Sequence, residues 1–416
     1  MAPRALPPGS RGAARHFPTR TSRSARSHPV DQLQAVTLDP VGADIPAEAA
    51  RLRERGPVVG ITLPGGIPAF AVTRYENLRT LILDPRVSKD PRKHWDRWPE
   101  ASSNPEWGWI LGWVGVINML STYGVDHSRL RKLVAPSFTH HRTERLRGRV
   151  EEIVTRLLDE IEARPEGEVV DLRAAYARQL PMEIICELFG VSGAHKAELV
   201  TLLDDFMDVS RPVEEAVATL ARLYAVLGEL IGTKRAEPGD DLASDLVSVR
   251  DTDGDRLSDD ELRDTLLLVI GAGVETTVNL IGNAAFALLT HPEQLAQARA
   301  GELPWEKVVT ETLRWAPSIA NLPMRFAVED IQGPETGGVL IPRGSAILTT
   351  YAAANHDPAH YGATAHLFDA HRDSGDHLAF GIGAHRCIGA PLAQLEAGVA
   401  LPALFPASRA CASRTR

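Results

Sequence analysis

The chain of 416 residues is long enough to bury a large core without disulfides or structural metals. Its formal net charge of −9 argues against nucleic acid as the main partner. No apolar run approaches the roughly 20 residues that a membrane span requires, so we expect no membrane partner. The three cysteines, Cys186, Cys387 and Cys411, do not form a disulfide framework, which favours a cytoplasmic protein.

The N-terminal segment, residues 1–30, differs in composition from the rest of the chain. It holds six arginines and no acidic residue, and it is rich in Pro, Ser and Gly. Because such a segment has little to bury, we predict a disordered basic tail, followed by one domain over residues 31–416. An organelle transit peptide has a similar composition and remains an alternative, as does a start codon assigned too far upstream.

The remaining sequence predicts a mainly α protein with a minor β part near each end. Residues 57–73 predict a β-hairpin, because two apolar runs flank a Pro-Gly-Gly turn. Residues 324–350 alternate in short runs that suit a small sheet, and an irregular stretch over 355–386 precedes a final helix over 390–404. Apolar residues at i, i+3 and i+4 predict the other helices: 126–139, 143–163, 180–190, 194–209, 212–235, 258–290 and 305–315.

The predicted helix 258–290 carries unfavourable residues at its centre. It begins with a capping box, in which Ser258 caps the helix and Glu261 reaches back. Its middle reads Gly-Ala-Gly-Val-Glu-Thr-Thr over 271–277, and glycine and threonine are poor helix formers. Threonine hydroxyls can also bond to the preceding turn and bend a helix. The pattern indicates a groove opened in this helix.

The most informative segment is Phe-Gly-Ile-Gly-Ala-His-Arg-Cys-Ile-Gly over 380–389. Its three glycines let the backbone turn tightly and approach a flat ligand. Cys387 lies just before the final predicted helix, where the first N–H groups and the helix dipole stabilise a thiolate. A thiolate ligand pushes electron density onto a haem iron, which favours O–O cleavage.

This segment resembles the haem-binding loop of the cytochrome P450 family, and other family landmarks follow in order from about residue 55 to about 404. The resemblance implies the cytochrome P450 fold, a triangular helical prism with small β-sheets. It implies haem b (heme b, iron protoporphyrin IX) as cofactor, with Cys387 as the sulfur ligand of the iron. Phe380, Gly381 and Gly389 are then cofactor-binding residues of the loop.

The same resemblance assigns roles to the centre of helix 258–290. Ala272 and Gly273 would form the oxygen-binding kink over the haem. Thr276 would hydrogen-bond dioxygen or its water, and Glu275 would relay protons inward. These residues imply a monooxygenase that inserts one oxygen atom from O2 into a bulky apolar small molecule, steroid- or polyketide-like.

Further residues match the family by position. His127, Arg131, Arg325 and His385 would pair with the haem propionates. Glu311 and Arg314, at i and i+3, look like the family's structural Glu-x-x-Arg pair. Cys186 lies in an apolar helical stretch and is expected to pack in the core. A second set consists of five tryptophans that could line an apolar cavity or pack in the core: Trp95, Trp98, Trp107, Trp109 and Trp113.

The implied partners are a ferredoxin and an NAD(P)H-dependent ferredoxin reductase, because no G-x-G-x-x-G fingerprint follows a strand. A basic patch of Arg129, Lys132, Arg142 and Arg386 could steer the acidic ferredoxin. We expect a monomer. Only 29 residues follow Cys387, and they show no strand alternation, so we expect the family's C-terminal strands to be truncated.

The truncation favours one alternative function, a haem-binding protein with an incomplete pocket and no catalysis. A second alternative uses the same cradle with peroxide in place of dioxygen, although Glu275 and Thr276 argue against it. A purely structural helical protein would require the surroundings of Cys387 to be a coincidence.

Overall fold

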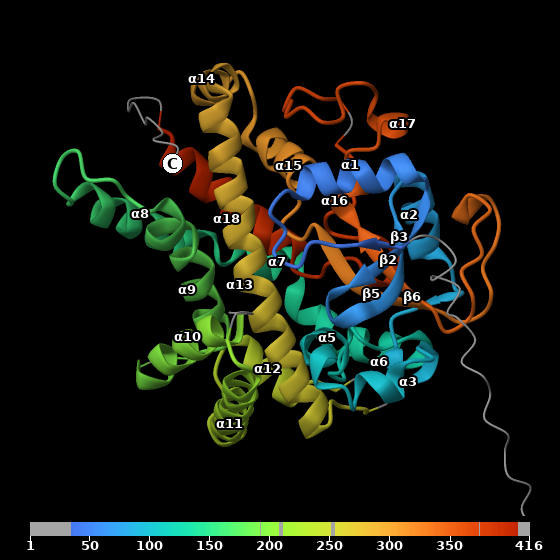
Figure 1. The fold of residues 1–416 in the computed structure, drawn as a ribbon. Coiled ribbons are helices and arrows are strands. Elements are labelled where there is room, and N and C mark those ends of the chain that lie inside the picture. Colours follow the sequence, from blue (N-terminus) through green and yellow to red (C-terminus); the bar gives the residue numbers. More distant parts are fainter. Residues whose placement is uncertain (1–34, 192, 208–210, 251–253, 374, 407–416) are drawn as a thin grey trace, which may run out of the picture.

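The computed structural model describes residues 35–191, 193–207, 211–250, 254–373 and 375–406. The predicted basic tail, Cys411 and the residues after 406 lie outside these ranges, so the expected tail and truncation remain expectations. Figure 1 shows helices on one side and a sheet on the other, with the long helix α13 (Asp259–Thr290) running between them. The predicted fold class, mainly α with a minor β part, is confirmed.

The described strands form one mixed sheet in the order β1-β2-β3-β6-β5-β4. Strands β2 and β3 are antiparallel, β3 and β6 are parallel, and β6, β5 and β4 are antiparallel in turn. The strand bounds are β1 (Val36–Thr37), β2 (Val58–Leu63), β3 (Ile67–Val72), β4 (Val87–Ser88), β5 (Asn321–Ala327) and β6 (Ala346–Thr350).

The predicted hairpin over 57–73 is confirmed as β2 and β3. Its turn is the short 3-10 segment η2 (Pro64–Gly66), in which Gly65 and Gly66 have φ values of 77° and 78°. These left-handed values explain why the turn carries two glycines. The predicted sheet over 324–350 is confirmed as β5 and β6, separated by an irregular connection.

Each predicted helix has a counterpart: α15 and α18 match their predicted ranges, and the bounds of the others are shifted. The counterparts are α6 (Gly124–Val134), α8 (Arg147–Glu162), α9 (Gln179–Leu188), α10 (Gly193–Met207), α11 (Val213–Ala236), α13, α15 (Trp305–Trp315) and α18 (Ala390–Leu404). The Ser258–Glu261 capping box of α13 is also confirmed. Helices without a specific prediction include α1 (Ile45–Arg55), α2 (Tyr75–Leu83), α5 (Gly108–Val114), α12 (Leu242–Ser248), α14 (Pro292–Ala300) and α16 (Tyr351–Ala354).

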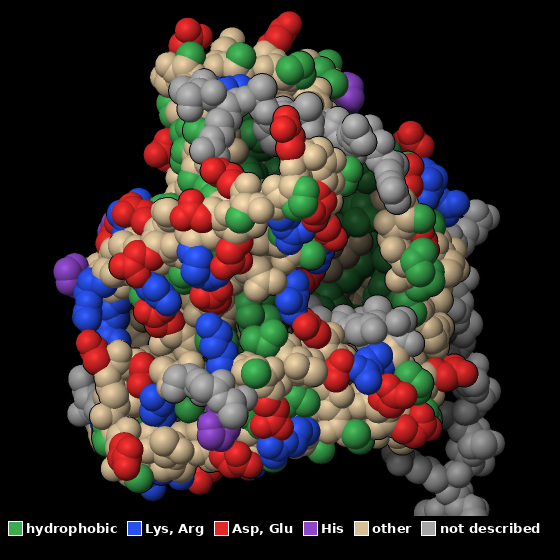
Figure 2. Space-filling view, turned by 90° about the vertical axis from the view of Figure 1, so that its left-hand side faces the viewer, with side chains coloured by type: hydrophobic (Ala, Val, Ile, Leu, Met, Phe, Trp, Pro, Cys, Tyr) green, Lys and Arg blue, Asp and Glu red, His purple; other side chains and the backbone are tan. Residues whose placement is uncertain are grey.

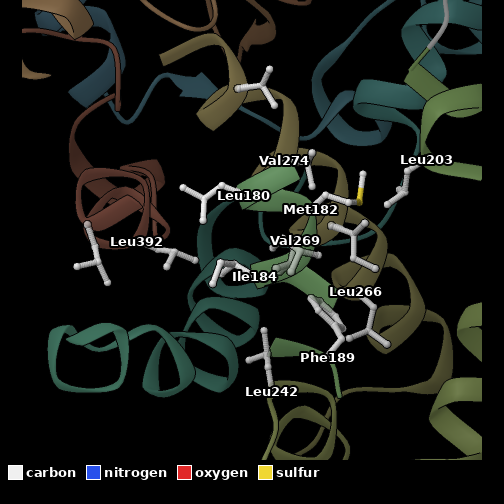
Figure 3. Close-up of a cluster of buried hydrophobic side chains, with 14 of the residues drawn as sticks. Leu180, Met182, Ile184, Phe189, Leu203, Leu242, Leu266, Val269, Val274 and Leu392 are labelled. Carbon is white, nitrogen blue, oxygen red and sulfur yellow. The ribbon is translucent and has the colours of Figure 1, made fainter. Parts of the chain in front are cut away.

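The largest core lies where α9, α13 and α18 meet. Figure 3 shows Leu180 and Ile184 of α9, Val269 of α13 and Leu392 of α18 gathered there. Cys186 of α9 is 1% exposed, which confirms its expected place in the core. This packing fixes α13 against α18, the helix that follows the Cys387 loop.

The expectation that no segment reaches the length of a membrane span is wrong. By length and composition alone, Glu214–Ala236 and Asp259–Thr290 could each cross a membrane. Helix α13, however, packs against α9, α11, α15 and α18, and Leu223, Leu227 and Ile231 of α11 belong to the largest core cluster. A helix that is apolar on most sides is also what the centre of a large core requires.

Candidate functional site

The loop before α18 folds into a series of tight turns. Gly381 and Gly383 have φ values of 61° and 69°, in the left-handed region that favours glycine. The N–H of Cys387 donates to the carbonyl of Phe380 at 2.8 Å, and this bond closes the loop. The N–H groups of Gly389 and Ala390, at the start of α18, face the Cys387 sulfur. The segment thus holds one sulfur at the start of a helix.

The Cys387 side chain is exposed, yet the surrounding protein is dense enough that burial raises the pKa of the thiol. The two observations agree if the exposed surface of Cys387 faces a hollow inside the protein. Hydrogen bonds from Gly389 and Ala390, and the charges of Arg131 and Arg386, lower the pKa but do not outweigh burial. A bound metal cation would lower the pKa of this thiol and deprotonate it, as it does for any thiol that coordinates a metal.

The four side chains predicted to hold propionates converge in front of this loop. His127 and Arg131 lie one turn apart on α6, Arg325 lies on β5, and His385 precedes Cys387. The ring centroids of His127 and His385 lie 4.0 Å apart. Burial lowers the pKa of His385, and the nearby charges of Arg325 and Arg131 lower it further.

These residues fit an anionic cofactor. Within the described residues, Nε2 of His127 is buried and has no hydrogen-bond partner. Arg325 is 4% exposed, and burial lowers the pKa of its guanidinium, opposed among the described residues by Tyr351 and by no carboxylate. Buried cations need anionic partners, and a haem carries two propionates. The cations and the Cys387 sulfur together match the chemistry of haem b.

The residues of α13 that the sequence analysis singled out, over 271–277, include exposed and half-buried positions. Ala272 is exposed in the middle of this helix, and Glu275 and Thr276 are half-buried. The Thr276 hydroxyl donates to the carbonyl of Ala272 at 2.7 Å, which is the back-bonding expected from the sequence. A Cβ at Gly273 would lie 2.7 Å from Cδ1 of Ile185, so Gly273 permits the close approach of α9.

Glu275 has a partner that sequence reasoning missed. Arg173, in the π-helical turn η5 (Arg173–Ala177), forms an ion pair with Glu275 and donates to Oδ1 of Asn279 at 2.8 Å. Arg173 therefore bridges two residues one turn apart on α13. No local signal marks Arg173, because it lies 102 residues before Glu275.

The helical side of the molecule is hollowed. Figure 2 shows a deep opening whose wall consists largely of hydrophobic side chains. Apolar walls favour apolar ligands, because both surfaces leave water on binding.

Glu311 and Arg314 form a buried bidentate pair, with Nε and Nη2 of Arg314 2.7 and 2.6 Å from the two carboxylate oxygens. Arg314 also donates to the carbonyls of Asn355, Ala365 and Leu367 at 2.7–3.0 Å. The pair thus ties α15 to the irregular stretch before the Cys387 loop, in the structural role that the resemblance implied.

The tryptophans divide between the two alternatives. Trp95 and Trp107 are 4% and 2% exposed and stack with centroids 5.9 Å apart, so both belong to the core. The half-buried Trp98 packs against the same cluster. Trp109 and Trp113 lie on α5 and are 38% and 39% exposed. A cavity role is therefore excluded for the first pair.

The expected basic patch is largely neutralised within the protein. Arg129 forms ion pairs with Asp255 and Glu261, and Arg142 forms one with Asp245. Arg386 is exposed beside the sulfur-bearing loop. Ion pairs therefore offset the charges of Arg129 and Arg142, and the basic patch stays a prediction.

Comparison with known proteins agrees with this geometry. The family model described as Cytochrome P450 matches residues 305–406. The chain is 39% identical over 368 residues to 2-hydroxy-5-methyl-1-naphthoate 7-hydroxylase of Streptomyces carzinostaticus, covering 88% of each chain. It is 39% identical over 363 residues to 6-deoxyerythronolide B hydroxylase of Saccharopolyspora erythraea, covering 86% of each. The structure of CYP154A1 from Streptomyces coelicolor A3(2) superposes with a TM-score of 0.81 at 45% identity, covering 89% of this chain and 91% of that one. The chain therefore belongs to the cytochrome P450 family of haem b monooxygenases.

Proposed function

We propose that this enzyme hydroxylates a bulky, largely apolar small molecule of the polyketide or steroid kind. The hydrophobic hollow of Figure 2 carries the proposal, because its wall would accept a large apolar surface. Two relatives support it by name, since one acts on a naphthoate and another on 6-deoxyerythronolide B.

The residues of the site would have two roles, binding the iron and binding the propionates. Cys387 would hold the iron, and His127, Arg131, Arg325 and His385 would hold the propionates. When bound, the haem supplies the activation of dioxygen and the transfer of one oxygen atom.

Proton supply is proposed to run through α13. Thr276 Oγ1, now bonded to the Ala272 carbonyl, can rotate to hold a water or to donate its own proton. Glu275 would take protons from solvent at its carboxylate and pass them towards Thr276, while Arg173 fixes the position of that carboxylate.

The first test is the carbon monoxide difference spectrum of the reduced protein, followed by binding of macrolactones, steroids and naphthoates. A strongly red-shifted Soret band would support Cys387 as thiolate ligand. A binding-induced spin change with one class, and its hydroxylated product, would identify the substrate. A red-shifted band without any product would favour the haem-binding protein that lacks catalysis.

Replacing Thr276 tests the proton route. In Thr276→Ala, we expect reductant consumption to continue while product per electron pair falls about tenfold or more, as for loss of a proton-handling group. Thr290→Ala is the matched control, because Thr290 makes the same back-bond to Phe286 at the end of α13. Unchanged coupling in Thr276→Ala, measured as product per NAD(P)H, would contradict the role.

We further propose that a ferredoxin and an NAD(P)H-dependent reductase deliver the electrons to a cytoplasmic monomer. Arg386 belongs to the predicted patch and lies in the sulfur-bearing loop, directly before Cys387. Arg386→Glu should lower ferredoxin-driven turnover more than peroxide-driven turnover, since both depend on the haem site and only the first depends on docking. Equal loss in both assays would place the defect in the haem site.

A further inference from the structure

Lys89 is a buried lysine that neither the fold nor the proton route explains. It follows β4 directly and is 3% exposed. Burial lowers the pKa of its ammonium, and the charge of Arg325 lowers it further. Among the hydrogen bonds and ion pairs of the described ranges, none involves Lys89. A buried ammonium without a partner is costly, so the position calls for an anion.

The strand register shows which side chain Lys89 faces. Strands β4 and β5 are antiparallel, with Val87 opposite Ala327 and Ser88 opposite Phe326. The next step of this register sets Lys89 opposite Arg325. Directly opposed residues have Cβ atoms about 4.5–5.5 Å apart, and like charges in such positions repel. Two buried cations thus face one another at the end of the same strand pair.

The neighbouring acid does not neutralise this pair. Asp90 follows Lys89, but its carboxylate accepts from the N–H of Arg92 at 3.1 Å and lies 3.3 Å from Arg92 Nε. Asp90 also lies 3.7 Å from Nζ of Lys93. The Asp90 carboxylate therefore interacts with residues of the following helix, α3 (Pro91–His94).

Lys89 also belongs to the group of cations in front of the Cys387 loop. Its charge acts on His385 together with the charges of Arg325 and Arg131. This places its ammonium on the side of the strand pair that faces the cofactor cradle. We propose that Lys89 is a further binding partner of a haem propionate, forming with Arg325 the two-cation end of the cradle.

The test measures haem loss, because activity would not separate binding from chemistry. We would follow transfer of haem from the holoenzyme to excess apomyoglobin, for wild type, Lys89→Met, Lys89→Arg and Lys93→Met. Lys93→Met is the matched control, since Lys93 is half-exposed on the same segment and pairs with Asp126. A charge-assisted hydrogen bond contributes about 1.5–3 kcal/mol, so Lys89→Met should release haem about 10- to 100-fold faster.

Lys89→Arg should restore most of the wild-type rate, because it keeps the charge and can donate to a carboxylate. Lys89→Met should also lower the midpoint potential, since an unneutralised propionate favours the ferric state. Lys89→Gln provides the same comparison if the methionine variant does not accumulate.

Two outcomes would overturn the proposal. One is a rate of haem loss in Lys89→Met equal to that of wild type. This result is expected if Lys89 has only a structural role. The other is equally fast loss from Lys89→Met and Lys89→Arg, which would indicate packing in place of charge. The assignment rests on haem binding and is independent of the proposed substrate and ferredoxin.

Discussion

Glu396 of α18 is a buried acid outside the proposed chemistry. It is 1% exposed, and within the described chain its Oε2 has no hydrogen-bond partner. Burial raises the pKa of this carboxyl from 4.5 to about 8. The folded protein therefore binds a proton that the unfolded chain releases above pH 4.5, so the group's contribution to stability falls between pH 4.5 and 8.

Glu396→Gln should remove this pH dependence. The amide stays neutral, so at pH 8 the variant should be more stable than wild type by up to about 4 kcal/mol. Urea unfolding of the holoenzyme at pH 6.5 and pH 8 measures the difference. Glu293→Gln, at an exposed position of α14, should show no such gain. An equal response of the two variants to pH would contradict the assignment.

For single residues, the sequence predicted those that belong to a short continuous motif. Cys387, Gly381 and Gly389 fall in one ten-residue pattern, and the loop has the predicted tight turns. Arg173 and Lys89 gave no such signal. Arg173 reaches Glu275 from 102 residues away, and Lys89 meets Arg325 only through strand pairing. Contacts of this kind depend on the topology, which a single sequence does not specify.

Arg314 joins helix α15 to the segment before the haem loop, together with bonds that Glu311 and Trp315 make to the same segment. Arg314 is 1% exposed, and its guanidinium donates to one carboxylate and three backbone carbonyls. Lysine cannot reproduce this planar set of donors. The element therefore depends on the shape of the group as well as its charge.

We expect Arg314→Lys to lower the free energy of unfolding by about 3 kcal/mol or more, because buried acceptors and Glu311 lose their partners. Arg149→Lys is the control, since Arg149 pairs with Glu187 and Glu152 at the surface and should change stability by less than about 1 kcal/mol. Urea unfolding of both holoenzymes measures the difference. Similar losses in the two variants would show that the Arg314 geometry is unimportant.

The element predictions were most accurate for α15 and α18. Helix α15 matched its predicted range, because one face is apolar and the other polar. Helices α1 and α2 carried no prediction although they pack beside the sheet. The parallel pairing of β3 with β6 could not be predicted, because more than 270 residues separate Val72 from Thr349.

At the scale of the whole molecule, buried histidines and a buried glutamate change the stability of the fold with pH in opposite directions. Burial lowers the pKa of His356 and His377 from 6.5 to about 4, so each adds stability that is lost as pH falls from 6.5 towards 4. Burial lowers the pKa of His94 in the same direction. Glu396 acts in the opposite sense, between pH 4.5 and 8.

The balance of these groups predicts a stability maximum near pH 6.5. Between pH 4.5 and 6.5 the unfolded chain binds at least two protons more at the histidines, while the folded protein binds one more at Glu396, so stability rises with pH. Among Glu396, His356 and His377, the histidine contributions level off above pH 6.5, and the Glu396 contribution lowers stability until about pH 8. Urea midpoints of the holoenzyme from pH 4.5 to 8.5 measure the curve. In Glu396→Gln the alkaline limb should become flat while the acid limb remains. A wild-type maximum above pH 8 would mean that Glu396 is ionised in the folded protein at neutral pH.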